Sequence, residues 1–280
     1  MPAAFTPEQV SVFSFSGIYE EQDFWRELPV GPDGSPFHFH DLTALPGTNG
    51  YLSDDAETAI RCQIDPIAPG GLHFIDSGNT HYMTKLFTDR IRQPFGLVLF
   101  DHHPDMQLPA FGGLLSCGSW LRAALEGNTA LREVWLVGVD PGLLRTALAE
   151  ADDSNALPPA STDTPFTLQF AGRPVHLLPG NRPTDAASFL PSADAPLPLY
   201  LSVDKDVLDA SEITTNWDQG NMTAGTLFSS LLFLRDNTDL LGVDICGECS
   251  PSGLPGARSA AIRQNDIFNR KVLDIFLNSL

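Results

Sequence analysis

Short apolar runs recur along the chain, and most of them are apolar at consecutive positions rather than at alternate ones. This pattern is typical of strands that are buried on both faces, as in a parallel sheet covered by helices. The runs lie at 72–75, 95–100, 134–139, 175–178, 199–203 and 240–245. They predict the strands of a largely parallel sheet.

Helix-like stretches separate several of these runs, at 120–125, 143–151 and 226–234. Alternating strands and helices favour an open sheet, so we predict a three-layer α/β/α fold with a mostly parallel central sheet. The tract at 152–165 is poor in large apolar residues and predicts a surface loop. Turn signals predict a less regular N-terminal layer over residues 1–65, and we expect one domain that spans residues 1–280.

The chain has 280 residues, with 16 basic and 35 acidic side chains and a formal net charge of −19. Nucleic acid is not an expected partner, because contacts with phosphates require Lys and Arg. No apolar run predicts a membrane span, and the first residues do not resemble a secretion signal. Four cysteines do not make a disulfide framework, so we expect a cytoplasmic protein. An acidic surface is compatible with cationic ligands and metal ions.

Polar residues gather directly after two of the predicted strands, where ligands bind in parallel sheets. Asp101, His103 and Asp105 follow one strand, and alternate residues of an extended chain share a side. Asp204 and Asp206 have the same spacing after another strand. Two carboxylates this close repel each other unless a cation lies between them or one holds a proton. Carboxylates together with an imidazole are the ligand set of a divalent ion.

A third segment follows the strand at 72–75, where a turn containing glycine leads to His81 at the start of an expected helix. The three segments resemble the metal-binding motifs of the ureohydrolase family, which includes arginases, agmatinases and formiminoglutamases. That family has a turn ending in His, then Asp-x-His-x-Asp, then Ser-x-Asp-x-Asp-x-x-Asp. This chain reads GNTHY at 78–82, DHHPD at 101–105 and SVDKDVLD at 202–209. The resemblance implies an arginase-like fold.

The resemblance also implies two metal ions, bridged by Asp101 and Asp204. One pair of residues completes each ion, namely His81 with Asp105 and His103 with Asp206. Two neighbouring ions hold hydroxide at neutral pH, and Asp105 would orient it. In the family this hydroxide attacks a planar carbon, usually of a guanidinium group. The predicted function is hydrolysis of a C–N bond in a guanidino, amidino or formimino compound, with two Mn²⁺ ions and a small cationic or amidine-type substrate.

A softer match follows the last predicted strand, at Gly247-Glu248-Cys249-Ser250-Pro251. The family has Asp-x-x-Glu followed by Pro, and its Glu binds the guanidinium group. Here the spacing from Asp244 to Glu248 is one residue longer. The resemblance implies that Glu248 contacts the substrate and takes part in catalysis. The alternative is a solvated carboxylate at the end of a strand.

Other residues with metal-ligand chemistry have simpler interpretations. Cys246 and Cys249 form a C-x-x-C, but no second pair completes a zinc site, and we expect two partly buried thiols. His102 should face away from His103 and take a packing role. His38 and His40 have the spacing of a ligand pair, but nothing connects them with the other clusters.

The segment MQLPAFGGLLSCGSW at 106–120 departs from the arginase pattern. Arginases have a His there that shuttles protons, and they have Ser and Asn groups for the amino-acid end of the substrate. This segment has no His, so we do not expect L-arginine to be recognised in the usual way. Gln107, Ser116 and Trp120 are the candidate substrate contacts. Trp120 would form an apolar or cation–π wall, or else belong to the core.

Two other functions are compatible with the sequence. A deacetylase-like amidohydrolase of the same fold would hold one zinc ion and would need only part of this ligand set. A catalytically silent, metal-binding relative would have lost turnover together with the loop His. The complete set of six ligands favours the binuclear hydrolase. Relatives are often oligomers, so a homo-oligomer is compatible with the sequence, which identifies no interface.

Overall fold

The structure is a computed structural model, and it describes residues 9–26, 28, 37–151, 164–180 and 197–277. Most of the predicted surface loop at 152–165 lies outside the described residues, and so does GPDGSP at 31–36, one of the turn signals in the predicted N-terminal layer.

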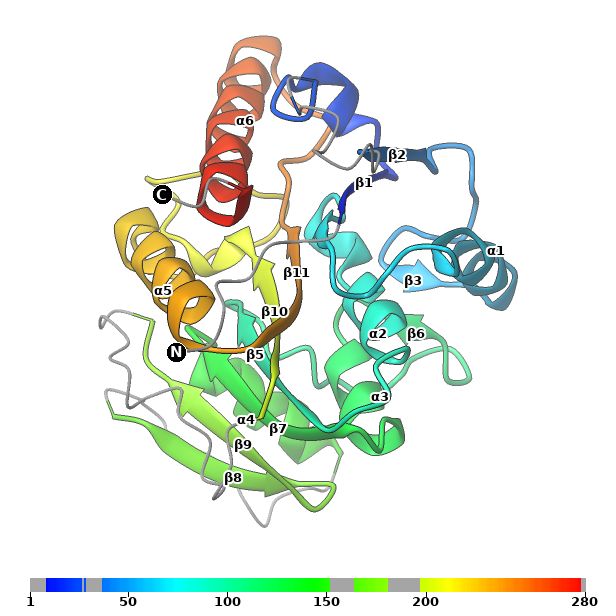
Figure 1. The fold of residues 1–280 in the computed structure, drawn as a ribbon, viewed down its shortest axis with the longest axis vertical. Coiled ribbons are helices and arrows are strands. Elements are labelled where there is room, and N and C mark those ends of the chain that lie inside the picture. The colour runs from blue at the N-terminus through cyan, green and yellow to red at the C-terminus, as the bar shows by residue number, and fades with distance from the viewer. Residues whose placement is uncertain (1–8, 27, 29–36, 152–163, 181–196, 278–280) are drawn as a thin grey trace.

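A nine-stranded sheet runs through the centre of the described part of the chain (Figure 1). Across the sheet the order is β2 (His38–Asp41), β1 (Val10–Ser14), β4 (Leu72–Phe74), β11 (Leu240–Cys246), β10 (Leu199–Asp204), β5 (Phe95–Phe100), β7 (Leu131–Val137), β9 (Arg173–Leu178) and β8 (Phe166–Phe170). Neighbouring strands are parallel except β8 and β9, which pair antiparallel at one edge. The predicted mostly parallel sheet is confirmed.

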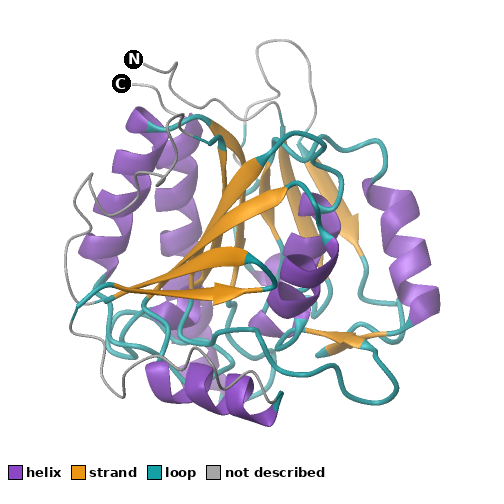
Figure 2. Ribbon diagram, turned by 90° about the horizontal axis from the view of Figure 1, so that it is seen from below, coloured by secondary structure: helices purple, strands orange, loops and turns teal. Residues whose placement is uncertain are grey.

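Helices cover both faces of this sheet, as Figure 2 shows from below. One core cluster joins the sheet to α5 (Ala224–Asn237) and α6 (Pro255–Leu277). A second cluster joins the other face to α1 (Asp54–Ile64), α2 (Met83–Thr88), α3 (Trp120–Gly127) and α4 (Pro141–Glu150). These are the three layers that the sequence predicted.

Strand β5 shows why the apolar runs are continuous. Val98 and Phe100 belong to the cluster under α5 and α6, whereas Leu97 and Leu99 belong to the cluster on the opposite face. Successive side chains of a strand point to opposite faces, so a strand covered on both sides needs an apolar residue at every position.

Side-chain caps define where three of the helices begin. The side chains of Ser53, Asp140 and Thr223 accept hydrogen bonds from backbone N–H groups in the first turns of α1, α4 and α5. Pro141 occupies the first turn of α4, where a missing N–H costs no intrahelical hydrogen bond. These caps satisfy donors that the helix itself cannot satisfy.

The predicted strands and helices are present, with ends that shift by a few residues. One expectation needs correction. The N-terminal segment is not only a less regular layer, because β1 lies inside the sheet between β2 and β4 and is buried along its whole length. Ser11 and Ser14 interrupt its apolar pattern, yet both are fully buried. No helix among the described residues is long and apolar enough to cross a membrane.

The order of the strands positions the site. β4, β11, β10 and β5 are consecutive and parallel, so their carboxyl ends meet at the same edge of the sheet. The turn after β4 contains the short 3₁₀ helix η2 (Gly78–Thr80), and η5 (Lys205–Val207) follows β10 directly. Each of the three predicted motifs therefore leaves the sheet at this edge.

His73 in β4 gives the fold a dependence on pH. Its ring is fully buried and stacks on Phe87 with ring centroids 4.2 Å apart. Burial lowers the pKa of His73 to about 3, whereas its value in an unfolded chain is near 6.5. The unfolded chain therefore binds a proton that the folded chain does not between these two values, and stability falls as the pH falls.

We expect the free energy of unfolding of the metal-free protein to fall by up to about 1.4 kcal/mol per pH unit below pH ~6 because of His73. In His73→Phe this contribution should be absent, which urea titrations at several pH values would measure. Equal slopes in the wild type and in the variant would contradict the assignment.

Candidate metal centre

The six predicted ligands come together at the carboxyl edge of the sheet. His81 lies between η2 and α2, and Asp101 follows β5 directly. Asp204 ends β10 and Asp206 lies in η5. Apart from His103, which is half-buried, these side chains and Asp105 are buried. Three segments that are distant in sequence thus bring His and Asp side chains into a common site.

Asp101 lies between the two histidines. Its Oδ2 atom is 3.2 Å from Nδ1 of His81, and its Oδ1 atom is 3.7 Å from Nδ1 of His103. Ligand atoms of His81, Asp101 and Asp105 lie within 4.8 Å of one another, and so do those of Asp101, His103 and Asp206. Asp101 is thus shared by two groups of possible metal ligands.

A chain of hydrogen bonds orients His81. The Ser202 hydroxyl donates to Asp244 Oδ1 at 2.6 Å, so its oxygen accepts from His81 Nε2 at 3.0 Å. Thr84 also donates to Asp244 Oδ1. With its proton on Nε2, a neutral His81 presents the lone pair of Nδ1 to the carboxylates. A metal-binding histidine commonly uses its second nitrogen in this way.

His103 has carboxylates at both ring nitrogens. Nδ1 lies 2.9 Å from Asp206 Oδ2 on the inner side, and Nε2 lies 3.1 Å from Asp218 Oδ1 on the outer side. The ring of Trp217 packs edge-on to His103 with centroids 5.6 Å apart. Asp218 and Trp217 are both exposed, and they lie on the loop between η5 and α5. This loop forms the outer border of the site.

Asp105 is held in an uncommon backbone conformation. Its φ is +49°, in the left-handed region that few residues other than glycine adopt. The indole Nε1 of Trp120 donates a hydrogen bond to Asp105 Oδ2, which also lies 3.0 Å from His81 Nδ1. Backbone N–H groups of α3 bond to the Asp105 carbonyl. These contacts hold the carboxylate beside His81.

The charges of the site favour a cation. Burial, together with Asp206, raises the pKa of Asp204, and burial together with Asp101 raises that of Asp206. Burial alone would lower the pKa of His81, but the nearby carboxylates of Asp101 and Asp105 outweigh it and raise this pKa well above its usual value. Without a cation, protons must offset the repulsion between buried carboxylates. A proton on His81 Nδ1 then occupies the place that a metal ion would take.

The donors present therefore fit divalent metal ions. Four buried carboxylates and two imidazoles converge there, and Asp101 Oδ2 is buried without accepting a hydrogen bond. A buried carboxylate oxygen that lacks a donor is costly unless a cation completes it. Carboxylate and imidazole donors suit Mn²⁺ and related ions.

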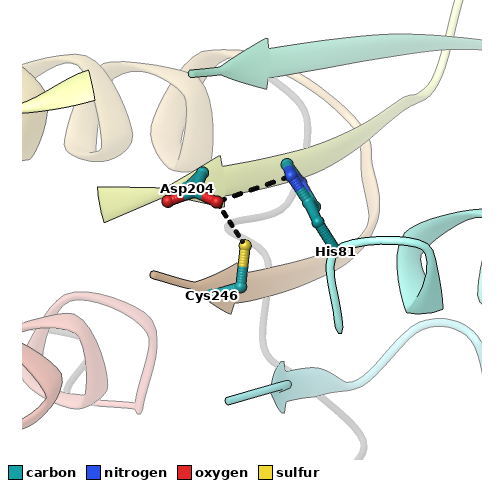
Figure 3. Close-up of side chains that lie close together, drawn as sticks. All are labelled: His81, Asp204 and Cys246. Atoms are coloured by element: carbon teal, nitrogen blue, oxygen red, sulfur yellow. Dashed lines mark hydrogen bonds and ion pairs between the residues drawn. The ribbon is translucent and has the colours of Figure 1, made fainter. Parts of the chain in front are cut away.

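A seventh side chain reaches this cluster. The thiol of Cys246 at the end of β11 donates to Asp204 Oδ2 at 3.1 Å, and His81 Nδ1 lies 3.6 Å from the same oxygen (Figure 3). Burial and the charge of Asp204 raise the pKa of the Cys246 thiol. The C-x-x-C was expected to hold two partly buried thiols, but both cysteines are buried, and the contact of Cys246 with Asp204 was not predicted.

No family model matches the chain. An uncharacterized protein of Thermotoga maritima is 28% identical to it over 247 residues, which cover 88% of this chain and 82% of that protein. Among solved structures, arginase from Bacillus subtilis aligns with a TM-score of 0.61 at 11% identity, over 98% of this chain and 99% of that chain. Formiminoglutamase from Trypanosoma cruzi, solved with Mn²⁺, aligns with a TM-score of 0.58 at 12% identity, over 95% and 92% of the two chains. The chain is a divergent member of the ureohydrolase fold.

Glu248 was expected to contact the substrate, but its carboxylate is bound by other side chains of the protein. Its side chain is fully buried, and Lys205 Nζ contacts Oε1 at 2.5 Å. Asn269 donates to the same oxygen, and Gln22 donates to Oε2 at 2.6 Å. Both oxygens are thus engaged by protein donors. The roles in substrate binding and catalysis that the resemblance implied for Glu248 do not fit this arrangement.

Of the other predicted substrate contacts, two are buried and one is exposed. Trp120 is fully buried and its only polar atom bonds to Asp105, so it cannot form a wall against a substrate. Ser116 is buried in β6 (Leu115–Ser116), which pairs with β3 (Tyr51–Leu52), and its hydroxyl donates to Ser119. Gln107 is exposed and remains a candidate contact.

The remaining histidines lie outside the two main ligand groups. His102 is half-buried with Nε2 3.7 Å from Asp218, and only its backbone N–H contacts Asp206. The expectation that His102 faces away from His103 is wrong, because the two rings pack edge-on with centroids 5.1 Å apart. Both rings approach Asp218 and form a possible ligand group with it on the outer side. His38 and His40 belong to β2, in a different part of the sheet. Ser202 and Asp244 were not singled out from the sequence, although Ser202 opens the SVDKDVLD motif.

Removing Asp204 tests the ligand assignment. In Asp204→Ala we expect Mn²⁺ affinity to fall by at least the ~10–100-fold that loss of an outer-sphere partner causes, because a charged donor close to His81 disappears. Elemental analysis after dialysis against a metal buffer would measure this. His102→Ala is the matched control, and it should keep its metal because its contact with Asp206 is made by the backbone. Unchanged metal content in Asp204→Ala would show that the assignment is wrong.

Removing Lys205 tests the structural role of Glu248. Lys205→Met leaves a buried carboxylate without its cation, so we expect a loss of about 3–5 kcal/mol in the free energy of unfolding. The double variant Lys205→Met/Glu248→Gln should recover most of this loss, because the side chain at 248 is then neutral. Urea unfolding of the three proteins measures both effects. A single variant within 1 kcal/mol of the wild type would contradict the role.

Proposed function

We propose that this chain is a metal-dependent hydrolase that uses two Mn²⁺ ions to cleave a C–N bond of a guanidino, amidino or formimino compound. The observation that carries the proposal is the position of Asp101, whose two oxygens lie near the imidazoles of His81 and His103. A carboxylate shared by two groups of possible ligands matches a site for two neighbouring ions. The ureohydrolase fold and the acidic site support the same reaction class.

Two ions at this site would lower the pKa of a water molecule and polarise the group under attack. His81, with Asp105 and Asp204, would hold one ion, and His103 with Asp206 would hold the other. The resemblance implied that Asp204 also bridges, but we assign it to the first ion alone, because its Oδ1 accepts from the Asp206 N–H and its Oδ2 lies beside His81. Asp101 would contribute an oxygen to each. Two residues that would not bind the ions hold the imidazoles in place. Ser202 bonds to His81, and Asp218 bonds to His103.

Asp105 is the residue we assign to proton transfer. Trp120 and His81 fix its Oδ2 atom, and the left-handed backbone sets the direction of the carboxylate. We assign Oδ1 as the acceptor of the proton that leaves the attacking water. The same oxygen then delivers this proton to the nitrogen that departs. For a guanidine, water adds one oxygen to the central carbon, and the products are urea and an amine.

The substrate is proposed to be a small cation or amidine. The chain carries a net charge of −19, and Asp218 is exposed beside His103. Trp217 is 43% exposed and packs against the same imidazole. An exposed indole next to a carboxylate suits a flat cationic group. Gln107 is a further polar group for the substrate, whereas Glu248 is committed to Lys205.

The experiment is metal analysis followed by a screen of guanidino, amidino and formimino compounds. We expect about two Mn²⁺ per chain and release of urea, ammonia or formamide from at least one compound. Asp105→Asn should lower kcat by roughly 10²–10⁴-fold with a smaller change in KM, because it removes a proton acceptor. A protein that holds two ions but is inert on the whole panel would contradict the proposed function.

A further inference from the structure

We propose that Cys246 is a sulfur ligand of the cation held by His81, so that this site contains a thiolate donor in addition to its carboxylates and imidazole. The inference rests on the metal centre of the proposed function and adds a seventh residue to it. The cation nearest His81 would then be bound by nitrogen, oxygen and sulfur, whereas the cation nearest His103 would have nitrogen and oxygen donors alone.

The sheet itself places the thiol. Asp204 and Cys246 are register partners at the ends of the parallel neighbours β10 and β11, so their side chains leave the sheet on the same side. Gly247 follows with φ +90°, and any side chain there would collide with Asp204 Oδ1. The absence of a side chain at 247 lets the end of β11 approach Asp204. Cys246 is thus fixed by the backbone rather than by a mobile loop.

The distances are those of atoms that can surround one ion. Two ligand atoms that bind the same ion at about 2.0–2.3 Å lie at most about 4.6 Å apart. Sγ of Cys246 lies 3.1 Å from Asp204 Oδ2, and that oxygen lies 3.6 Å from His81 Nδ1. His81, Asp204 and Cys246 form one of the groups whose ligand atoms all lie within 4.8 Å (Figure 3). The thiol needs only a small shift to join this ion.

The same His81 nitrogen connects the thiol with the other ligands. Nδ1 lies within 3.2 Å of both Asp101 Oδ2 and Asp105 Oδ2. Asp101 Oδ2 is buried and accepts no hydrogen bond, so a polar atom without a donor points into the same cluster. An ion placed among these atoms would have Cys246 as a neighbour. Upon ligation the S–H proton passes to solvent, and the sulfur–metal bond replaces the hydrogen bond to Asp204.

The other cysteines provide contrasts. Cys249 is buried in the core cluster under α5 and α6, whereas Cys246 belongs to the cluster on the opposite face of the sheet. The two thiols of the C-x-x-C therefore do not share a ligand group, and both are free. Cys117 is only half-buried, and it too belongs to no ligand group among the described residues.

The consequence is a change in metal preference. Thiolate is a soft donor that favours Zn²⁺ or Co²⁺, whereas carboxylates suit Mn²⁺. The two positions of this centre should then differ, and the position at His81 should bind the softer ion. Replacing the sulfur by oxygen should reduce this difference.

The test is a titration of the metal-free full chain with Co²⁺, followed by absorption spectroscopy and metal analysis. The wild type should show the near-ultraviolet band of sulfur-to-cobalt charge transfer. The absorbance of this band should reach its maximum when one Co²⁺ ion is bound per chain. Cys246→Ser, in which the hydroxyl can still donate to Asp204, should lose the band. It should also lose about tenfold or more in its preference for Zn²⁺ over Mn²⁺. Cys249→Ser and Cys117→Ser are the matched controls, and both should keep the band.

X-ray absorption of the wild type tests the same point without a variant. One sulfur neighbour at about 2.3 Å from the bound Zn²⁺ is expected. Cobalt and zinc bound with only nitrogen and oxygen neighbours would overturn the role of Cys246 and leave the proposed function standing. A band that persists in Cys246→Ser would overturn it as well. A protein that binds no divalent ion at all would overturn both this inference and the proposed function.

Discussion

The repulsion between buried carboxylates is the constraint on which the site depends. Asp101, Asp105, Asp204 and Asp206 are all buried in one cluster at the end of the sheet. Negative charges this close and this dry cannot all remain ionised unless positive charge lies among them. Protons on His81 and His103 can supply it in a metal-free protein, and the two divalent ions that we propose for this site would supply it more completely. Cation binding is thus favourable at this cluster, because it relieves the repulsion between the carboxylates.

The parallel sheet makes this arrangement possible because it ends four neighbouring strands at one edge. Its buried strands cannot shift without breaking both core clusters, so the ligand positions are as rigid as the core. A second set of contacts then sets each ligand's direction, from Ser202 to His81, from Trp120 to Asp105 and from Asp218 to His103. The sheet provides location and these contacts provide orientation.

A buried ion pair between Lys205 and Glu248 lies beside the acidic cluster. Lys205 lies between Asp204 and Asp206 in the sequence, but its Nζ atom contacts Glu248. Asn265, Asn269 and Gln22 complete this network under α6. Its lysine and carboxylate pair with each other. The metal site therefore keeps its own excess of negative charge.

Much of the fold was predictable because a sheet buried on both faces requires continuous apolar runs, and β5, β7 and β10 show them directly. β1 was missed because Ser11 and Ser14 break its apolar pattern, although the strand is buried along its whole length like the neighbouring strands. The convergence of His81 with the two Asp clusters was predictable from spacing and from a family resemblance. The partners of Glu248 and Trp120 were not, since Gln22 and Asn269 lie far from Glu248 in sequence and the bond from Trp120 to Asp105 depends on a left-handed turn. Contacts of this kind arise from tertiary packing and cannot be predicted from the local sequence pattern.

The most direct test of the central claim is a crystal structure of the Mn²⁺-soaked protein, with anomalous diffraction recorded at the manganese edge. The account predicts two anomalous peaks about 3.5–4 Å apart, one beside His81 and one beside His103, with the Asp101 carboxylate between them. Peaks elsewhere on the acidic surface, or a soaked crystal in which no manganese binds between His81 and His103, would contradict it.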